Sequence, residues 1–247
     1  MELEYLILIV AVAGASTLQS ASGIGFGVIA GPIMLIVLDS EAAILLSTIL
    51  SLLIAVLLAP SLWAKVDRRL LARLLAGTVV GLPIGLFVFV AVGIDLLKLM
   101  AGLMVVFTLV FLWRAGRGPS GKSGNFEQLS IGALSGIMGA SLAMPGPIAA
   151  AWMAGRSYGK DTIRATILTM FIVSYTAALI LQVWAAGFSA DTGRLCMILA
   201  VPTVIGVYVG RLLVKHLTEA RFTQVLTVVL LATSVSLFVT SIPRLVN

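Results

Sequence analysis

The chain has 247 residues, of which 60% are hydrophobic and only 11% are charged, and its formal net charge is +6. Soluble domains carry about 25% charged residues to keep their surfaces hydrated, so this composition excludes an ordinary water-soluble fold. The single cysteine, Cys196, excludes an internal disulfide and a cysteine-based metal site. We therefore expect an integral membrane protein, with lipid rather than nucleic acid as its main surroundings.

Hydrophobic segments follow one another along the whole chain. In the first half they run roughly over residues 4–22, 24–38, 41–63, 70–92 and 95–113. In the second half they run roughly over residues 127–143, 146–156, 162–186, 192–213 and 222–242. A spanning helix needs roughly 20 apolar residues, and most of these segments are close to that length. We therefore divide one membrane domain into residues 1–113, a glycine-rich and serine-rich cytoplasmic linker at 114–125, and residues 126–247.

The basic residues fall mainly on one side of this arrangement. If each segment reverses direction, 13 of the 16 lysines and arginines lie on one side, and Lys98, Arg194 and Arg244 lie on the other. Cytoplasmic loops carry such an excess of positive charge. This pattern predicts a multi-pass protein of the inner or plasma membrane with both termini external. We expect the first segment to be retained, because no basic residue precedes Lys65.

The two halves resemble each other in sequence. SGIGFGVIAGPIM at 22–34 matches SGIMGASLAMPGPIA at 135–149, STILS at 47–51 matches ATILT at 165–169, and VVGLPIG at 79–85 matches VIGVYVG at 204–210. An odd number of segments in each half makes the second copy run opposite to the first. We therefore predict an all-α fold of two inverted-topology repeats, each a broken or re-entrant helix hairpin followed by three transmembrane helices. Inverted repeats are typical of secondary transporters.

Glycine and proline coincide in the stretches 20–32 and 135–147, where we expect each repeat to break a helix near the middle of the membrane. The short segment after each break would then present free N–H groups at its N-terminus, which favour an anion. The glycine pairs Gly81/Gly85 and Gly206/Gly210 are expected only to allow close helix packing. The predicted substrate-binding residues lie at and beside the breaks: Ser20, Ser22, Gly23, Gly25, Gly27, Thr48, Ser51, Ser135, Gly139, Ser141, Pro145, Gly146, Thr166 and Thr169.

No Asp, Glu, Lys, Arg or His lies in the middle of a predicted span. This absence favours a small anion over a metal cation, and it disfavours an enzyme. We expect no cofactor. Gln19 and Gln182 are weaker candidates that could equally bridge helices, and Lys160 and Arg164 are expected mainly to set topology. The remaining charged residues at segment ends are expected to be solvated: Asp39, Glu41, Lys98, Asp191 and Arg194.

The paired stretches SGIGFGVIAGP and SGIMGASLAMPGP, in a chain of about this length, resemble the TauE/SafE family of sulfite exporters. The resemblance implies a permease that carries sulfite, a sulfonate, thiosulfate or a related small anion, with export as the expected direction. The partners it implies are that anion and the lipid bilayer, and a homo-oligomer stays open. Two other functions also stay open, a permease for an unrelated small solute and a membrane receptor or scaffold subunit that transports nothing.

Overall fold

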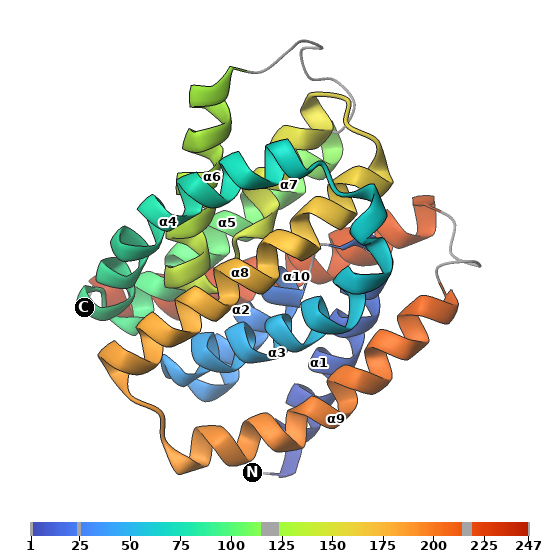
Figure 1. Cartoon of the computed structure of the whole chain (residues 1–247). Helices are drawn as coiled ribbons and strands as arrows, with labels where there is room; N and C mark the ends of the chain where they lie inside the picture. Colours follow the sequence, from blue (N-terminus) through green and yellow to red (C-terminus); the bar gives the residue numbers. More distant parts are fainter. Residues whose placement is uncertain (1, 24–25, 115–123, 214–218, 247) are drawn as a thin grey trace.

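The computed structural model describes residues 2–23, 26–114, 124–213 and 219–246, and these residues are almost entirely helical (Figure 1). The elements are α1 (Glu2–Ser22), α2 (Phe26–Leu38), α3 (Ala42–Leu58), the 3-10 helix η1 (Ala59–Lys65), α4 (Arg68–Ala91), α5 (Ile94–Arg114), α6 (Asn125–Leu142), α7 (Gly146–Gly155), α8 (Lys160–Ala186), α9 (Ala190–Leu213) and α10 (Glu219–Val246). The prediction of an all-α fold is confirmed. Gly25 and most of the linker at 114–125 lie outside the described residues.

Helix length separates two classes of element. Within the described residues, five helical stretches are long and apolar enough to cross a membrane: Leu3–Ser20, Ala42–Lys65, Arg68–Ala91, Lys160–Ala186 and Ala190–Leu213. In contrast, α2 has 13 residues and α7 has 10. At 1.5 Å per residue they rise only about 20 and 15 Å, less than the roughly 30 Å of a hydrocarbon core. The protein is therefore a multi-pass membrane protein that contains two half-length helices.

Glycines allow two pairs of long helices to approach closely. Along α4, a Cβ atom at Gly77, Gly81 or Gly85 would lie within 3.0 Å of the backbone of α6. Along α9, a Cβ at Gly206 or Gly210 would meet the backbone of α1 in the same way. The packing role predicted for Gly81, Gly85, Gly206 and Gly210 is confirmed. In both pairs the contacting residues rise in number along both helices at once. Therefore α4 runs parallel to α6, and α1 runs parallel to α9.

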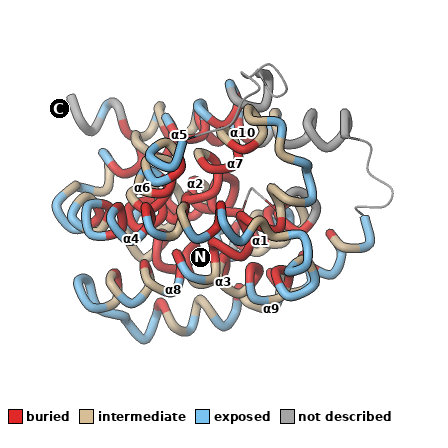
Figure 2. The backbone as a smooth tube through the Cα atoms, turned by 45° about the horizontal axis from the view of Figure 1, so that its top comes forward, coloured by how far each residue is buried: buried red, intermediate tan, exposed pale blue. Residues whose placement is uncertain are grey.

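The two half-length helices lie at the centre of the molecule. Residues 26–32 of α2 are all buried, and the buried part of the tube in Figure 2 lies inside the outer helices. The outer helices expose large apolar side chains such as Val80 and Phe87 on α4 and Val201 on α9. Water would disfavour so much exposed apolar surface, whereas lipid does not. The half-helices are thus shielded from lipid by the long helices.

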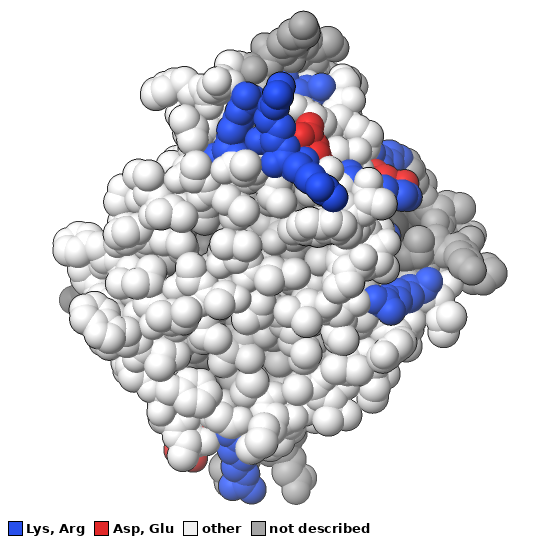
Figure 3. All heavy atoms as spheres, viewed as in Figure 1, with Lys and Arg blue, Asp and Glu red and all other residues white. Residues whose placement is uncertain are grey.

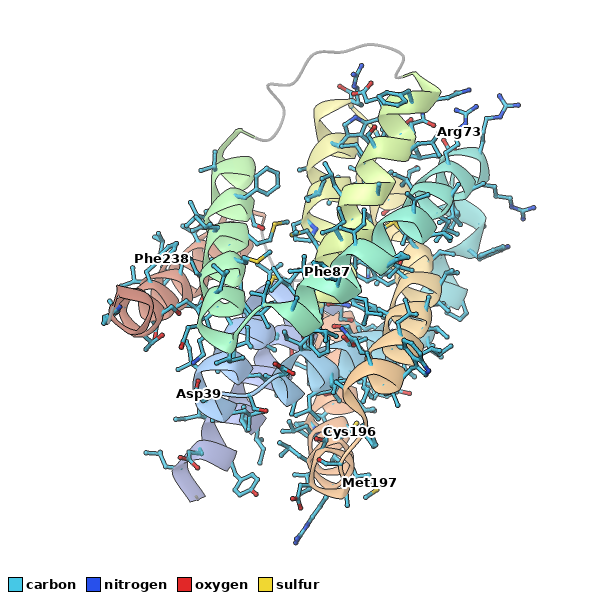
Figure 4. The ribbon with its side chains drawn as sticks, turned by 90° about the vertical axis from the view of Figure 1, so that its left-hand side faces the viewer. Asp39, Arg73, Phe87, Cys196, Met197 and Phe238 are labelled. Carbon is cyan, nitrogen blue, oxygen red and sulfur yellow. The ribbon has the colours of Figure 1, made fainter. Side chains whose placement is uncertain are left out.

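Charged side chains gather toward the ends of the molecule. Figure 3 shows Lys and Arg mainly toward the upper end of the face in view, with further basic side chains at its right-hand edge and at its lower end, while the broad centre and left of that face carry no charge. Figure 4 places Arg73 at the same end and Asp39 and Met197 toward the opposite end. This distribution agrees with the excess of Lys and Arg that the sequence predicts at one end of the helices.

One expectation about charge is wrong. Lys98, in the first turns of α5, is only 2% exposed and is not solvated. It forms an ion pair with Asp39, which follows α2, and a longer one with Asp95 at 3.9 Å. The lysine is buried because the start of α5 packs against α2. The other charged residues at segment ends keep partial or full exposure: Asp39, Glu41, Asp191 and Arg194.

Candidate functional site

The first interruption separates α1 from α2. Gly23 has a φ of +79°, and its N–H donates to the carbonyl of Gln19 at 2.7 Å, which ends α1. A left-handed residue at this place commonly closes a helix, and glycine adopts it without a steric penalty. The side chain of Gln19 then crosses the gap, where its Oε1 accepts a hydrogen bond from the Phe26 N–H at 2.8 Å. Gln19 therefore caps the first residue of α2.

An arginine from the other half of the chain lies against this interruption. A Cβ at Gly23 would be 2.6 Å from Cγ of Arg164, which belongs to the second turn of α8. The guanidinium of Arg164 donates to the carbonyl of Ser20, one of the last carbonyls of α1. Cations are favoured at helix C-termini, where carbonyls lack partners within the helix. Arg164 therefore contacts the candidate site, whereas the sequence suggested mainly a role in setting the topology.

The second interruption separates α6 from α7. The N–H of Ala143 donates to Gly139 and that of Met144 donates to Met138, both at 3.1 Å, and Pro145 precedes the first residue of α7. Ala143 is left-handed, with a φ of +57°, which costs a residue other than glycine about 1–2 kcal/mol. Gly139 itself lies inside α6. The break therefore falls at residues 143–145, close to the segment boundary predicted there.

The two interruptions meet. A Cβ at Gly27, in the first turn of α2, would lie within 3.0 Å of the carbonyl oxygen of Ala143. The same oxygen accepts a hydrogen bond from the hydroxyl of Tyr175 on α8 at 3.0 Å, and Tyr175 is 2% exposed. The hydroxyl of Ser51 on α3 lies close to that of Tyr175, without the geometry of a hydrogen bond. Both half-helices, α3 and α8 therefore converge on one buried region.

Several buried serine hydroxyls lack partners. Five serines are at most 1% exposed, and their Oγ atoms have no hydrogen-bond partner within the described residues: Ser47 and Ser51 on α3, Ser135 on α6, Ser174 on α8 and Ser241 on α10. Of these, Ser51 lies beside Tyr175, where the two interruptions meet. A buried polar group without a partner is uncommon and costs roughly 1–3 kcal/mol. Such groups are available to a polar ligand. Ser51 and Ser135 are among the residues predicted from the sequence, whereas Ser47 and Ser174 are not.

A signal for Ser47 was present, since it lies four residues before Ser51 in the matched stretch STILS, so both share one face of a helix. Its Oγ is 3.5 Å from the position of a Cβ at Gly31, which places it beside α2. Ser174 has no counterpart in the matched stretches. It could be found only from the three-dimensional structure.

Several predicted site hydroxyls already have partners. Thr48, Ser141 and Thr169 each donate to the carbonyl four residues earlier on their own helix. Ser20 donates to the carbonyl of Val207 on α9 at 2.9 Å, and the hydroxyl of Thr166 accepts from the N–H of Asp67 at 3.3 Å. Serine and threonine often bond the backbone in this way in membrane helices.

The remaining predicted residues are small ones at close contacts. Gly139 packs on Pro145, and a Cβ at Gly146 would be 2.6 Å from the ring of Phe171. Gln182 donates to the carbonyl of Ala140 at 2.7 Å, so it does bridge two helices. Gly25 and the side chain of Ser22 lie outside the described residues. The structure thus brings Gly27, Ser51 and the second interruption together, while Ser20 faces α9 and Thr166 contacts the start of α4.

Comparison with known proteins identifies a family that the chain matches. A model of the sulfite exporter TauE/SafE family matches residues 6–237, which include both interruptions and the helices around them. A search of curated proteins and a search of solved structures returned no match. The match covers far more than half of the 247 residues. The chain therefore belongs to the sulfite exporter TauE/SafE family.

Proposed function

We propose that the protein is a secondary transporter that exports a small sulfur-containing anion, such as sulfite, a sulfonate or thiosulfate. The family match supports a membrane transporter of sulfur anions. The observation that carries the proposal is the meeting of two interrupted helices at Gly27 and Ala143, beside buried serine hydroxyls that lack partners. Hydroxyls and the N–H groups of a helix start donate hydrogen bonds, which is what an oxyanion requires.

The helix packing supports two repeats of opposite orientation, α1–α5 and α6–α10. If α1 corresponds to α6 and α4 to α9, the close pair of α1 and α9 becomes the close pair of α6 and α4. Likewise, α3 packs on its counterpart α8, and α5 packs on its counterpart α10. A two-fold axis that exchanges the two repeats would exchange these helix pairs in the same way. Transporters with inverted repeats move one repeat against the other around a central site, and we propose the same alternation here.

A cavity supports a path from the serines to the far end of the molecule. It has a volume of about 310 Å³ and opens between the first turns of α1, α3 and α9. Its polar lining includes one basic and one acidic residue beside hydroxyls: Arg194, Asp191, Ser40, Ser189 and Thr192. Leu46, the neighbour of Ser47, also lines it. This end lies opposite the basic end, which we propose is cytoplasmic, as the positive-inside rule requires. Both termini are then external, and the cavity serves as an exit.

Flux measurements test this function directly. The purified protein, reconstituted into liposomes, is expected to give saturable release of sulfite, thiosulfate, taurine or sulfoacetate, above the leak of protein-free liposomes. Release of chloride from the same liposomes serves as the control for a nonselective pore. If none of the four sulfur compounds moves faster than in protein-free liposomes, the proposal fails. A receptor or scaffold subunit would then explain the fold better.

A further inference from the structure

Two buried hydrogen-bond donors at the first interruption have no partner within the described residues, Nε2 of Gln19 and Nε of Arg164. Gln19 is 1% exposed, and its Oε1 is held by the N–H of Phe26. This bond fixes the orientation of the amide, because the reverse orientation would place two donors against each other. Nε2 of Gln19 is therefore held beside the first residue of α2, and no acceptor among the described residues receives its hydrogens.

The electrostatics of this place favour negative charge. The N-terminus of α2 carries the positive end of a helix dipole, and the guanidinium of Arg164 adds a full positive charge. The positive charge of Arg211 is close enough to repel that of Arg164, while the negative charge of Asp161 attracts it. The carboxylate of Asp161 also forms an ion pair with Lys65 at 2.5 Å, and both of these side chains are more than half exposed.

Arg164 has a buried Nε atom that has no hydrogen-bond partner within the described residues. Its terminal nitrogen donates to Ser20, and its stem packs on Gly23, so the position of the group is fixed by α1. Nε still needs an acceptor, because a buried guanidinium nitrogen without one loses its hydration. An anion with three or more oxygen atoms could accept from this nitrogen and from Gln19 together.

We infer that Gln19 and Arg164 form an anion-binding site at the first interruption, which holds the oxygen atoms of sulfite or of a sulfonate group. The site lies toward the basic end of the molecule, between that end and the serines where the two interruptions meet. The inference rests on the proposed function and deepens it, because it names the residues that recognise the charge of the solute. Gly23 serves the site by letting Arg164 approach the end of α1.

The variant Gln19→Glu separates capping from anion binding. A glutamate keeps the oxygen that accepts from Phe26 and adds a charge that suits the start of α2, so thermal stability is expected to equal or exceed that of the wild type. The same change replaces the free donor by an acceptor and sets a negative charge in the site. The sulfite concentration at half-maximal flux is therefore expected to rise about tenfold or more, as for losing a hydrogen bond to a charged group.

Two further variants keep the test decisive. Gln128→Glu makes the same charge change at a buried glutamine of α6 that accepts from Arg73, and it should leave sulfite flux unchanged. Arg164→Lys keeps the charge but removes Nε, and it should also raise the half-saturation concentration. If wild-type flux is saturable and both Gln19→Glu and Arg164→Lys keep its half-saturation concentration, this inference is wrong while the proposed function stands.

Thermal stability of the purified wild type gives a second readout that does not depend on flux. Sulfite should raise the unfolding temperature of the wild type and not that of Gln19→Glu. The measurement is repeated in nanodiscs of neutral phosphatidylcholine and in nanodiscs that contain anionic phosphatidylglycerol. Stabilisation by phosphatidylglycerol but not by sulfite would identify a lipid headgroup as the occupant and would overturn the inference. If the wild type transports no sulfur anion at all, the proposed function and this inference fail together.

Discussion

Replacing Gly27 by alanine is expected to reduce sulfur-anion flux at least about tenfold while the protein still inserts into the membrane. The added Cβ would lie within 3.0 Å of the carbonyl oxygen of Ala143, and real Cβ atoms essentially never come that close to another atom. Overpacking of this kind destabilises the packed conformation by roughly 1–3 kcal/mol. Most of that range corresponds to a tenfold or larger fall in the population of this conformation. The backbone on both sides is buried, so it has little room to shift.

Gly14 supplies the matched control for this change. It lies within α1, it is exposed, and a Cβ there would meet nothing within 4 Å. Gly14→Ala is therefore expected to keep full flux and to gain up to about 1 kcal/mol from helix propensity. Flux assays in liposomes and unfolding in detergent should be run on both variants. Equal flux in Gly27→Ala and Gly14→Ala would show that the contact between the two interruptions does not matter for transport.

Replacing Lys98 by methionine is expected to lower the free energy of unfolding by about 2–3 kcal/mol. The lysine is 2% exposed and pairs with Asp39 and Asp95, so its loss leaves carboxylates near apolar surface without their cation. Removing one partner of a buried pair costs roughly 3–5 kcal/mol. The expected effect is somewhat smaller here, because the side chain of Asp39 is still 45% exposed and water can solvate it.

Lys65 provides the comparison for Lys98. It pairs with Asp161 at the basic end, and the two side chains are 52% and 65% exposed. Exposed pairs contribute at most about 1 kcal/mol, so Lys65→Met should change stability by less than that amount. Both variants can be followed by reversible unfolding in mixed micelles, with tryptophan fluorescence as the signal. Similar losses in the two variants would contradict the burial of the pair at Lys98.

The two interruptions could be predicted because their signals are local. Glycine at 23 and 27 and proline at 145 and 147 disfavour continuous helix whatever surrounds them. In the structure α1 ends at Ser22 before α2 begins at Phe26, and α6 ends at Leu142 before α7 begins at Gly146. The close packing at Gly81 and Gly206 was also predictable, because each lies four residues before a second glycine, on the same face of its helix.

The contacts that set charge and partners could not be predicted in this way. Lys98 is 59 residues from Asp39 in the sequence, and Arg164 is 144 residues from Ser20. Pairings over such separations depend on how the helices are packed, and a single sequence does not encode that packing in any short pattern. For the same reason, the sequence could not tell which hydroxyls bond their own helix, as Thr48 does, and which stay without partners, as Ser47 does.

We propose that the anion passes where the two interrupted helices meet, beside Ser51. This path is tested by the rate at which a methanethiosulfonate reagent that bears a sulfonate modifies Ser51→Cys, in a protein that also carries Cys196→Ser. Excess sulfoacetate or taurine should slow this reaction severalfold. Neither should change the rate for Ser130→Cys, whose hydroxyl lies exposed near the start of α6. Modification of Ser51→Cys at one rate, whether or not these anions are present, would contradict the claim.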